Sequence, residues 1–371
     1  MAELDSVASA IFVAQAFHKV TGATGFIGSH IVSQLLAKNI KVRAVVRSAN
    51  KVKTIFPDAG SQLEIVELPS LLEDHTEALK GVSAVIHTAF PAFFKGATSE
   101  ETFKGTYEGT LNIVNQSITS GIKKIIVTGT VVNLFDADYK NAFGSKVITE
   151  KDFGDIELKD IKPSEQDASF VYQAAKTVAD KKLQDIAQEH PEVDITVREY
   201  PFVQAQPDCQ LTNMTVLPPL VFGPLVPNFP YTPDINQLGT NFVVYGLITG
   251  DRDGPDAYPS LNIGHLVDVR DIAKAHVLAL DAPKVPGRHK RMIIHGNIFK
   301  WKDAVKVIRK AHPELTQRLP LADTIPPPQT DAPLDTTFAG EVLGLKEYIP
   351  WQESVLAALE VCLEHERRFN T

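Results

Sequence analysis

Short apolar runs alternate with stretches of helical periodicity over the first two-thirds of this chain. The apolar runs have the length and the β-branched content of buried strands, and they occupy residues 41–48, 62–68, 83–89, 123–130 and 215–222. Amphipathic helical patterns lie between them, notably at 27–38, 102–120 and 171–189. This alternation is typical of βαβ units. The sequence therefore predicts an α/β fold of the Rossmann type, in which a doubly wound parallel sheet carries helices on both faces.

The last third of the chain continues the pattern less regularly. Residues 264–283 are typical of a strand that enters a helix, residues 289–296 of a final strand, and residues 352–368 of a helix with an apolar stripe. Residues 324–333 are rich in proline and predict a stiff loop.

Composition narrows the classes of function. The 371 residues are 44% hydrophobic, which is enough for a sizeable core. The formal net charge of −8 argues against nucleic-acid binding, which needs a basic surface. Two cysteines fit a reducing compartment, and the histidines and cysteines lack metal-ligand spacing. No apolar run reaches the roughly 20 residues that span a bilayer, and the N-terminus is a poor signal peptide. We therefore expect a cytoplasmic protein without metal or membrane segment.

The segment TGATGFIGSH places Gly22, Gly25 and Gly28 between a candidate strand and the helix predicted at 27–38. Glycines at this spacing let the backbone approach a pyrophosphate at a helix N-terminus, where amide groups and the helix dipole favour anions. A glycine turn before an ordinary helix is the alternative. The place of the loop, near the N-terminus and between strand and helix, favours a dinucleotide site.

The residues after the second predicted strand indicate which dinucleotide binds. An NAD site has Asp or Glu there to hold the ribose 2′-hydroxyl, and VVRSANKVK contains no acid. Arg47 follows the strand directly, with Lys51 and Lys53 close behind. Because a guanidinium suits a 2′-phosphate, we predict NADP(H), with a solvated basic loop as the alternative. We expect residues 1–217, completed by 265–297, to form the NADP-binding domain, and residues 218–371 to form mostly a smaller substrate-binding lobe.

The segment VYQAAK supplies a candidate acid–base pair. Tyr172 and Lys176 are four residues apart on a predicted helix, so they share one face. An ammonium beside a phenol favours the phenolate, so we expect Lys176 to lower the pKa of Tyr172. Thr128 and Thr130 end a predicted parallel strand, where ligands bind in such sheets, although strand propensity alone can explain a threonine.

Together these motifs resemble the extended short-chain dehydrogenase/reductase family over nearly the whole chain. The closer likeness is to the branch of dihydroflavonol reductases, cinnamoyl-CoA reductases and fungal aldehyde or methylglyoxal reductases, in the segments VDVRDIAKAHVLAL, LPPLVFGP and TFAGEVLGLK. The resemblance implies NADPH-dependent reduction of an aldehyde or ketone to an alcohol, by a monomer or a homodimer.

The family pattern also implies roles for residues of this chain. Tyr172 would donate the proton to the carbonyl oxygen, Lys176 would tune Tyr172 and hold the nicotinamide ribose, and Thr130 would orient the carbonyl. The residues implied in cofactor binding are Gly22, Thr24, Gly25, Phe26, Ile27, Gly28, Arg47, Lys53, Glu67, Leu68, Thr88, Ala89, Thr128, Tyr172, Lys176 and Pro218.

Two other functions fit the same fold. An NAD-dependent sugar-nucleotide epimerase or dehydratase is disfavoured by the missing acid after the second strand. A regulator that senses NADP without turnover is disfavoured because Thr130, Tyr172 and Lys176 are all present. The apolar segments 90–94 and 241–250 are either a pocket for an aromatic or aliphatic carbonyl or simply core.

The chain departs from the family pattern at several places. Thr130 stands where serine is usual, and Glu67 where an Asp usually meets the adenine. Seven extra residues, 14–20, put His18 and Lys19 where a buried strand should lead into the glycine loop. A charged residue inside a parallel sheet is costly unless it is paired.

A core strand also begins twice, because DITV ends on Val197 and NMTV ends on Val216. We expect Asp194–Val197 to lead into a sheet strand that Val216–Phe222 completes. Residues 198–215 would then be an exposed excursion without a catalytic role. Because the codons at 198–200 can contain a splice donor and those at 214–216 an acceptor, a retained intron is a second explanation.

Overall fold

A computed structural model describes residues 16–91, 95–190, 212–254, 257–259, 263–283, 290–321, 324 and 331–369. Its centre is a seven-stranded sheet in the order β3-β2-β1-β4-β5-β6-β9, in which all neighbouring strands are parallel. The strands are β1 (Phe17–Thr21), β2 (Val42–Val46), β3 (Leu63–Glu67), β4 (Val82–His87), β5 (Lys124–Thr128), β6 (Thr212–Leu217) and β9 (Lys290–Ile293). The predicted doubly wound α/β fold is confirmed.

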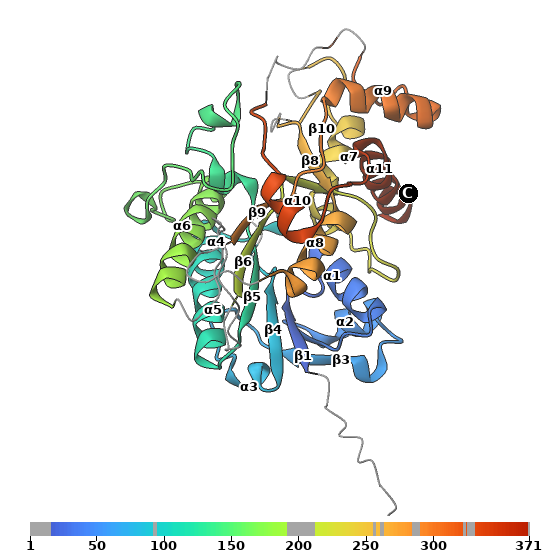
Figure 1. Cartoon of the computed structure of the whole chain (residues 1–371). Coiled ribbons are helices and arrows are strands. Elements are labelled where there is room, and N and C mark those ends of the chain that lie inside the picture. The colour runs from blue at the N-terminus through green and yellow to red at the C-terminus, as the bar shows by residue number, and fades with distance from the viewer. Residues whose placement is uncertain are drawn as a thin grey trace, which may run out of the picture.

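Helices cover both faces of this sheet (Figure 1). One face, which we call the α8 face, packs against α1 (Phe26–Ala37), α8 (Val269–Asp281) and α10 (Thr337–Leu343). The opposite face, the α5 face, packs against α3 (Thr76–Leu79), α5 (Gly109–Thr119) and α6 (Ala168–Glu189). The other helices of the central domain are α2 (Ala49–Ile55) and α4 (Ser99–Phe103), and one π-helical turn, Lys104–Glu108, joins α4 to α5.

Alternate residues of each strand point to opposite faces, as the pleat requires. On the α8 face they form one apolar cluster that includes Val20, Ala44, Ile86, Ile126 and Val216. The α5 face combines an apolar cluster, including Val85, Ile125 and Val127, with buried ionisable residues. The core therefore has one mainly apolar side and one mixed side.

A second, three-stranded sheet forms the base of the smaller lobe. It contains β7 (Leu220–Phe222), β8 (His265–Asp268) and β10 (Asn297–Ile298), and it packs with α7 (Phe242–Thr249), α9 (Trp301–Ala311) and α11 (Trp351–Phe369). These elements lie together at one end of the molecule, beyond α8 (Figure 1). Short 3₁₀ helices occupy Gly60–Gln62, Val131–Leu134, Lys140–Ala142, Leu158–Asp160, Ile235–Asn241 and Pro313–Leu315.

Strand β1 incorporates the unexpected charged residues. His18 and Lys19 lie in the strand, and Lys19 pairs in register with Arg43 on one side and Val85 on the other. Lys19 has no exposed surface, and its Nζ lies 2.9 Å from Nδ1 of His75. Burial and repulsion by Arg43 lower the pKa of Lys19 to about 7, and the pKa of His75 falls to about 4. The expected placement of both residues in a buried strand is confirmed.

The expected single strand at 215–222 is wrong, because the chain divides it between two sheets. β6 ends at Leu217 in the central sheet, and β7 begins at Leu220 in the smaller one. Pro218 and Pro219 lie between them, and proline cannot donate a ladder hydrogen bond.

Residues 198–215 are not wholly an exposed excursion, contrary to expectation. Thr212–Thr215 form the first part of β6 and pair with Lys124–Val127 of β5, and the side chains of Met214 and Thr215 are buried. Residues 191–211, which include the DITV segment, and most of the proline-rich segment 324–333 lie outside the described residues.

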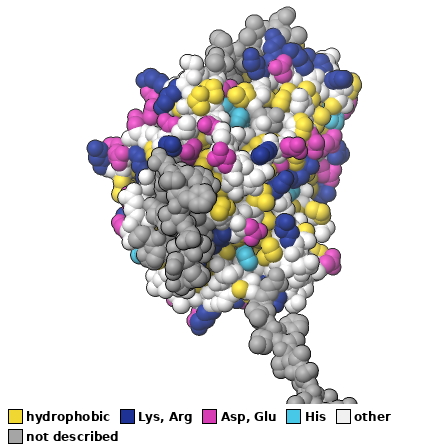
Figure 2. Space-filling model, in the orientation of Figure 1, with side chains coloured by type: hydrophobic (Ala, Val, Ile, Leu, Met, Phe, Trp, Pro, Cys, Tyr) yellow, Lys and Arg dark blue, Asp and Glu magenta, His cyan; other side chains and the backbone are white. Residues whose placement is uncertain are grey.

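Two observations concern the surface and possible membrane contact. No helix in the described part of the chain combines the length and the apolar character needed to cross a bilayer. On the face shown in Figure 2, acidic and basic side chains are interspersed rather than gathered into a basic band.

Candidate active site

The glycine loop between β1 and α1 is tightly packed against its surroundings. Gly22 has a φ of 72°, and a Cβ there would lie 2.6 Å from Oγ1 of Thr88. A Cβ at Gly28 would lie 2.1 Å from the carbonyl oxygen of Gly22. Side chains are thus excluded at both positions, and the loop backbone stays accessible at the start of the helix.

The N-terminus of α1 is suited to an anion. Its N-cap is Gly25, which provides no side-chain hydrogen bond, and the first turn contains no acidic residue. The first amide groups of a helix lack partners within the helix and carry the positive end of its dipole. The side chain of Phe26 is buried against Gly239, Ile27 joins the apolar cluster, and Thr24 lies in the loop itself, partly exposed.

Three cations gather beyond the end of β2. Arg47 is exposed, and its charge together with burial lowers the pKa of Lys51. Burial and the charges of Lys51 and Arg47 lower the pKa of Lys95 to about 8, against the attraction of Asp234. Lys95 joins this cluster from the loop after β4, and no local pattern in the sequence marks it.

The other residues predicted near the adenosine end lie as follows. Lys53 is exposed and lines a cavity of about 240 Å³ with Phe56 and Ile65, apart from this cation cluster. Oε1 of Glu67 accepts a hydrogen bond from the amide of Ala49 at the start of α2. The amide of Leu68 donates to the carbonyl of Val46. Glu67 and Leu68 thus flank the end of β2.

The segment after β4 is bonded to the end of β1. Oγ1 of Thr88 donates to the carbonyl oxygen of Thr21 at 2.8 Å, and the amide of Ala89 approaches Oγ1 of Thr21 at 3.5 Å. His87 lies between Oγ1 of Thr21 at 2.7 Å and Oγ1 of Thr110 at 3.1 Å. Burial, above all, holds the pKa of His87 well below its usual value, so this imidazole is neutral.

Tyr172 and Thr130 meet at the carboxyl end of β5. Helix α6 begins at the N-cap Asp167, whose carboxylate accepts hydrogen bonds from two amides of the first turn. One turn later the side chain of Tyr172 hydrogen-bonds that of Thr130. Its ring centroid lies 5.3 Å from that of Phe90. The phenol of Tyr172 and the hydroxyl of Thr130 are thus in contact, and the ring of Phe90 lies beside them.

Lys176 lies one turn further along α6. Its Nζ donates to the carbonyl oxygen of Thr128 at 2.9 Å and lies 4.9 Å from the ring centroid of Phe90. Burial lowers its pKa to about 8, and the carboxylate of Asp180 opposes that shift. Lys176 therefore remains mostly charged below pH 8.

The expected lowering of the pKa of Tyr172 is wrong for this structure. The pKa of Tyr172 is raised rather than lowered, chiefly by burial and further by Tyr139, while the hydrogen bond from Thr130 acts in the opposite direction. The ammonium of Lys176 is directed at a backbone carbonyl. Desolvation therefore dominates the titration of the phenol.

Thr128 and Pro218 contribute through their backbones. The hydroxyl of Thr128 is bonded to Nε2 of His276 in α8 at 2.8 Å, so its carbonyl rather than its side chain faces Lys176. The carbonyl of Pro218 accepts from the amide of Val131 at 3.0 Å, directly after Thr130. Thr128 and Pro218 therefore fix the segment that carries Thr130.

A second phenol near the site was missed by sequence reasoning. Tyr139 has a φ of 58°, a left-handed conformation that is uncommon for an aromatic residue, and its ring packs against Phe135. Burial, with the charge of Asp167, raises its pKa to about 12. No periodic pattern in the sequence marks this turn, so the position of Tyr139 is a result of tertiary structure.

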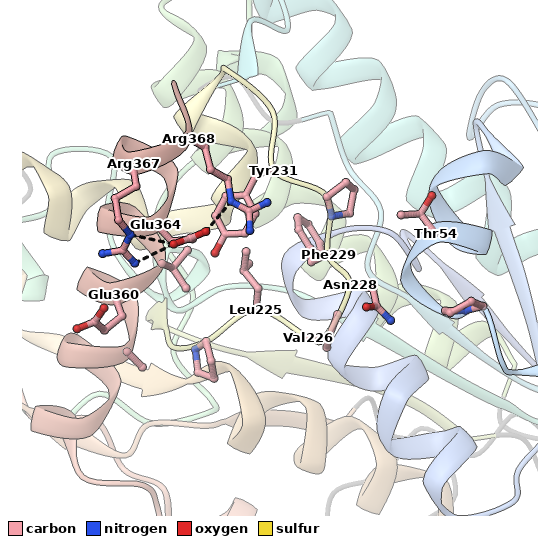
Figure 3. A pocket seen from close by; sticks show the side chains of 15 residues that line it. Thr54, Leu225, Val226, Asn228, Phe229, Tyr231, Glu360, Glu364, Arg367 and Arg368 are labelled. Carbon is pink, nitrogen blue, oxygen red and sulfur yellow. Dashed lines mark hydrogen bonds and ion pairs between the residues drawn. The ribbon is translucent and has the colours of Figure 1, made fainter. Parts of the chain in front are cut away.

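A cavity of about 960 Å³ lies elsewhere, between the loop after β7 and helix α11 (Figure 3). On its wall Glu364 pairs with Arg367 and Arg368, and the guanidinium of Arg368 lies 4.3 Å from the ring centroid of Tyr231. Its lining contains none of the predicted site residues; it consists of Thr54, Pro57, Pro224, Leu225, Val226, Asn228, Phe229, Pro230, Tyr231, Ala357, Glu360, Val361, Glu364, Arg367 and Arg368.

Comparisons with known proteins agree with this geometry. Residues 22–185 match a family model described as NAD(P)H-binding. An oxidoreductase of Schizosaccharomyces pombe is 29% identical, with 88% of this chain and 91% of the relative covered. A Candida albicans protein named as an NADPH-dependent methylglyoxal reductase is 28% identical, with 91% and 95% covered. The yeast methylglyoxal/isovaleraldehyde reductase Gre2, solved with NADPH, superposes on this structure with a TM-score of 0.78 at 22% identity. The superposition covers 95% of this chain and 99% of Gre2, so the two share the fold.

The chain therefore contains an NAD(P)H-binding domain, and over most of its length it is similar to proteins named as oxidoreductases and carbonyl reductases. The relatives that it resembles include proteins named as ketoreductases, as a methylglyoxal reductase and as dihydroflavonol reductases. The resemblance that its motifs predicted is confirmed.

Proposed function

We propose that this protein uses NADPH to reduce an aldehyde or a ketone to the corresponding alcohol. The observation that carries the proposal is the contact of Thr130 and Tyr172 at the carboxyl end of β5, one helical turn from Lys176. Relatives named as ketoreductases and as an NADPH-dependent methylglyoxal reductase support this reaction.

The residues present fit NADP(H). The uncapped start of α1 suits the pyrophosphate, and the close packing at Gly22 and Gly28 leaves the loop backbone free to approach it. Arg47 and Lys51 would hold the 2′-phosphate, since the like charges gathered there favour a bound anion. Lys51 is better placed for this than Lys53, which lies apart.

When bound, NADPH would supply the hydride to the carbonyl carbon. Negative charge then develops on the carbonyl oxygen, where the hydroxyl of Thr130 donates a hydrogen bond and the phenol of Tyr172 donates its proton. The raised pKa of Tyr172 keeps this proton available at neutral pH. The ammonium of Lys176 stabilises the phenolate that remains, and it carries its charge below about pH 8.

The ring of Phe90 beside Tyr172 favours an aromatic or aliphatic substrate over a charged one. The other apolar segment, 241–250, lies mostly in α7, where Val244, Leu247 and Ile248 belong to the core of the smaller lobe. Phe90 is thus the better candidate for contact with substrate.

The test is loss of NADPH absorbance with a panel of aldehydes and ketones, repeated with NADH. Turnover with at least one carbonyl compound, faster with NADPH, is expected. A sugar-nucleotide epimerase would convert its substrate without net NADPH consumption, and a regulator would bind NADPH without turnover. Either result would replace the proposal.

We also propose that the protein acts in the cytoplasm as a monomer or homodimer. Residues 1–217 and the returning segment 265–297, apart from β8 in the smaller lobe, would bind the cofactor, and the rest would mostly bind substrate. The low cysteine content and the parallel sheet completed by β9 support these assignments. Light scattering after gel filtration gives the oligomeric state, and a fluorescent fusion in cells gives the compartment.

A further inference from the structure

A fully buried ion pair lies behind the Tyr172–Lys176 site. The side chains of Asp180 and Arg291 are 2% and 3% exposed. Nε of Arg291 donates to Oδ2 of Asp180 at 2.8 Å, and a second guanidinium nitrogen lies 2.8 Å from the same oxygen. The third nitrogen donates to the carbonyl oxygens of Glu150 and Asp152 at 2.6 and 2.5 Å. The carboxylate is thus held by a guanidinium that is itself anchored to backbone.

Stability does not explain this pair. Desolvating two charges costs about as much as their attraction returns, and apolar residues of similar size often serve folding equally well. We therefore expect the buried carboxylate of Asp180 to act on the residues around it.

The position of Asp180 connects it to two parts of the proposed site. It lies four residues after Lys176 on α6, hence on the same helix face. Its Oδ2 also accepts from Nδ2 of Asn133 at 3.2 Å. Asn133 belongs to the 3₁₀ turn Val131–Leu134, whose N-cap is Thr130.

We propose that Asp180, held by Arg291, is a positioning residue for the carbonyl reduction. Its carboxylate keeps the Lys176 ammonium charged and in place, and through Asn133 it fixes the turn that presents Thr130 to Tyr172. The inference rests on the proposed roles of Tyr172 and Lys176.

Other ionisable groups near Lys176 do not replace this carboxylate. From β4, His87 is neutral and is itself destabilised as a cation by Lys176. From α6, Tyr172 keeps its proton, and Tyr139 from the turn after the site does the same, since the pKa of each is raised. From β9, Arg291 is already bound to Asp180. Asp180 supplies the negative charge that opposes deprotonation of Lys176.

The test compares the pH dependence of kcat/KM in Asp180→Asn with that of the parent. Loss of the carboxylate should move the alkaline limb, which Lys176 sets, to lower pH by about one unit. Asp180→Glu keeps the carboxylate charge, so its alkaline limb of kcat/KM should lie at the same pH as that of the parent. Glu366→Gln, which removes a carboxylate paired with Arg318 far from the site, is the matched control and should leave the limb unchanged.

Two additions keep the test decisive. Asp180→Asn leaves Arg291 buried without a counter-charge, so the double variant Asp180→Asn/Arg291→Met is measured beside it and should fold and show the same direction of shift. Selective ¹³C labelling of lysine side chains, with Lys176→Met for assignment, reports the titration of Lys176 without relying on turnover.

Unchanged titration of Lys176 in both Asp180 variants would overturn the proposal. A lowered titration with an unmoved limb would overturn it as well, because the carboxylate would then act on the lysine without controlling the reaction. Failure of the proposed function is distinguished by Tyr172→Phe: full turnover in that variant would remove the catalytic assignment, whatever Asp180 does to Lys176.

Discussion

The two faces of the central sheet are built from alternate residues of the same strands, yet they differ in chemistry. The α8 face is a mainly apolar cluster, in which residues such as Val20, Ile86 and Ile126 are fully buried. The α5 face buries many ionisable groups among its apolar side chains, namely Lys19, Arg43, His75, His87, Lys176, Asp180 and Arg291, whereas the α8 face buries fewer, among them His276 and Lys290.

This difference indicates that the α5 face contributes less to stability than the α8 face. Every ionised group moved out of water is unfavourable unless neighbours compensate. The proposed chemistry needs a charged lysine and a protonated phenol on α6, and α6 packs on the α5 face. The α8 face therefore mainly stabilises the fold. The α5 face carries the groups of the proposed reaction, and burying those groups lowers its contribution to stability. Substitutions on each face test this difference.

The largest effect is expected from Tyr172→Phe. Removing the proton donor should lower kcat/KM by about 100- to 10,000-fold. The ring that packs on Phe90 remains, so the Tm and the Kd for NADPH should change little. Steady-state kinetics, thermal unfolding and a binding titration check this result. Retention of most turnover would show that the α5 face does not carry the reaction in the proposed way.

The next effect concerns Lys19, which the α5 face buries without a carboxylate partner among the interactions described for it. Lys19→Met should raise the free energy of unfolding by roughly 5 kcal/mol near pH 6.5, since one unit of pKa shift corresponds to about 1.4 kcal/mol. The folded pKa, about 7, is below the unfolded value of 10.5. Between these values the unfolded parent binds more protons, so parent stability rises with pH and the advantage of the variant shrinks.

Urea denaturation of Lys19→Met and parent at pH 6.5 and pH 9.5 measures both quantities. A gain that is equal at the two pH values would mean that packing, and not the charge of Lys19, is responsible. A loss of stability would contradict the view that this lysine is a liability.

On the α8 face, Ile86→Ala should destabilise the fold by about 3 kcal/mol because it leaves a cavity in a fully buried cluster. The loss should not depend on pH, since no ionisable group is removed. The same denaturation series measures it. If the stability change of Ile86→Ala depended on pH as strongly as that of Lys19→Met, the proposed difference between the two faces would be wrong.

The smallest effect lies outside both faces, at the exposed Arg47. Arg47→Asp should weaken NADPH binding by about tenfold and shift preference toward NADH, because a carboxylate repels a 2′-phosphate and accepts from a 2′-hydroxyl. The Tm should stay unchanged, since the side chain is exposed. Lys53→Met is the control and should affect neither cofactor. An unmoved preference would assign recognition of the phosphate to Lys51 or Lys95.

The sequence predicted what local patterns encode. Apolar runs and helical periodicity sufficed for the parallel sheet and its covering helices, and the spacing of Tyr172 and Lys176 placed them on one helix face. It could not show the partners that meet only after folding: Asp180 and Arg291 are far apart in the chain, and Lys95 has no neighbouring signal. The titration of Tyr172 was predicted in the wrong direction because burial cannot be judged from spacing.

The division of the segment 215–222 was missed for a related reason. The apolar composition of this segment fits a strand of the central sheet and a strand of the smaller sheet equally well. The sequence pattern therefore does not show that one strand ends before Pro218 and Pro219 and another begins after them. The start of β6 at Thr212–Thr215, where Met214 and Thr215 are buried, lacks an obvious apolar run. Its pairing with β5, rather than its own hydrophobicity, makes it a strand.

The pairing of Asp180 with Arg291 has a consequence for biosynthesis. The two residues are 111 positions apart, with much of the smaller lobe between them. At cellular rates of roughly 5–20 residues per second, α6 leaves the ribosome about 6 to 22 s before its guanidinium partner. Until β9 arrives, the sheet has an open edge at β6 and the helix carries an uncompensated acid. Maturation of the enzyme is therefore a late event, completed only when the chain returns to its first domain, and a polypeptide released before β9 would expose both the edge and the acid to chaperones and proteases.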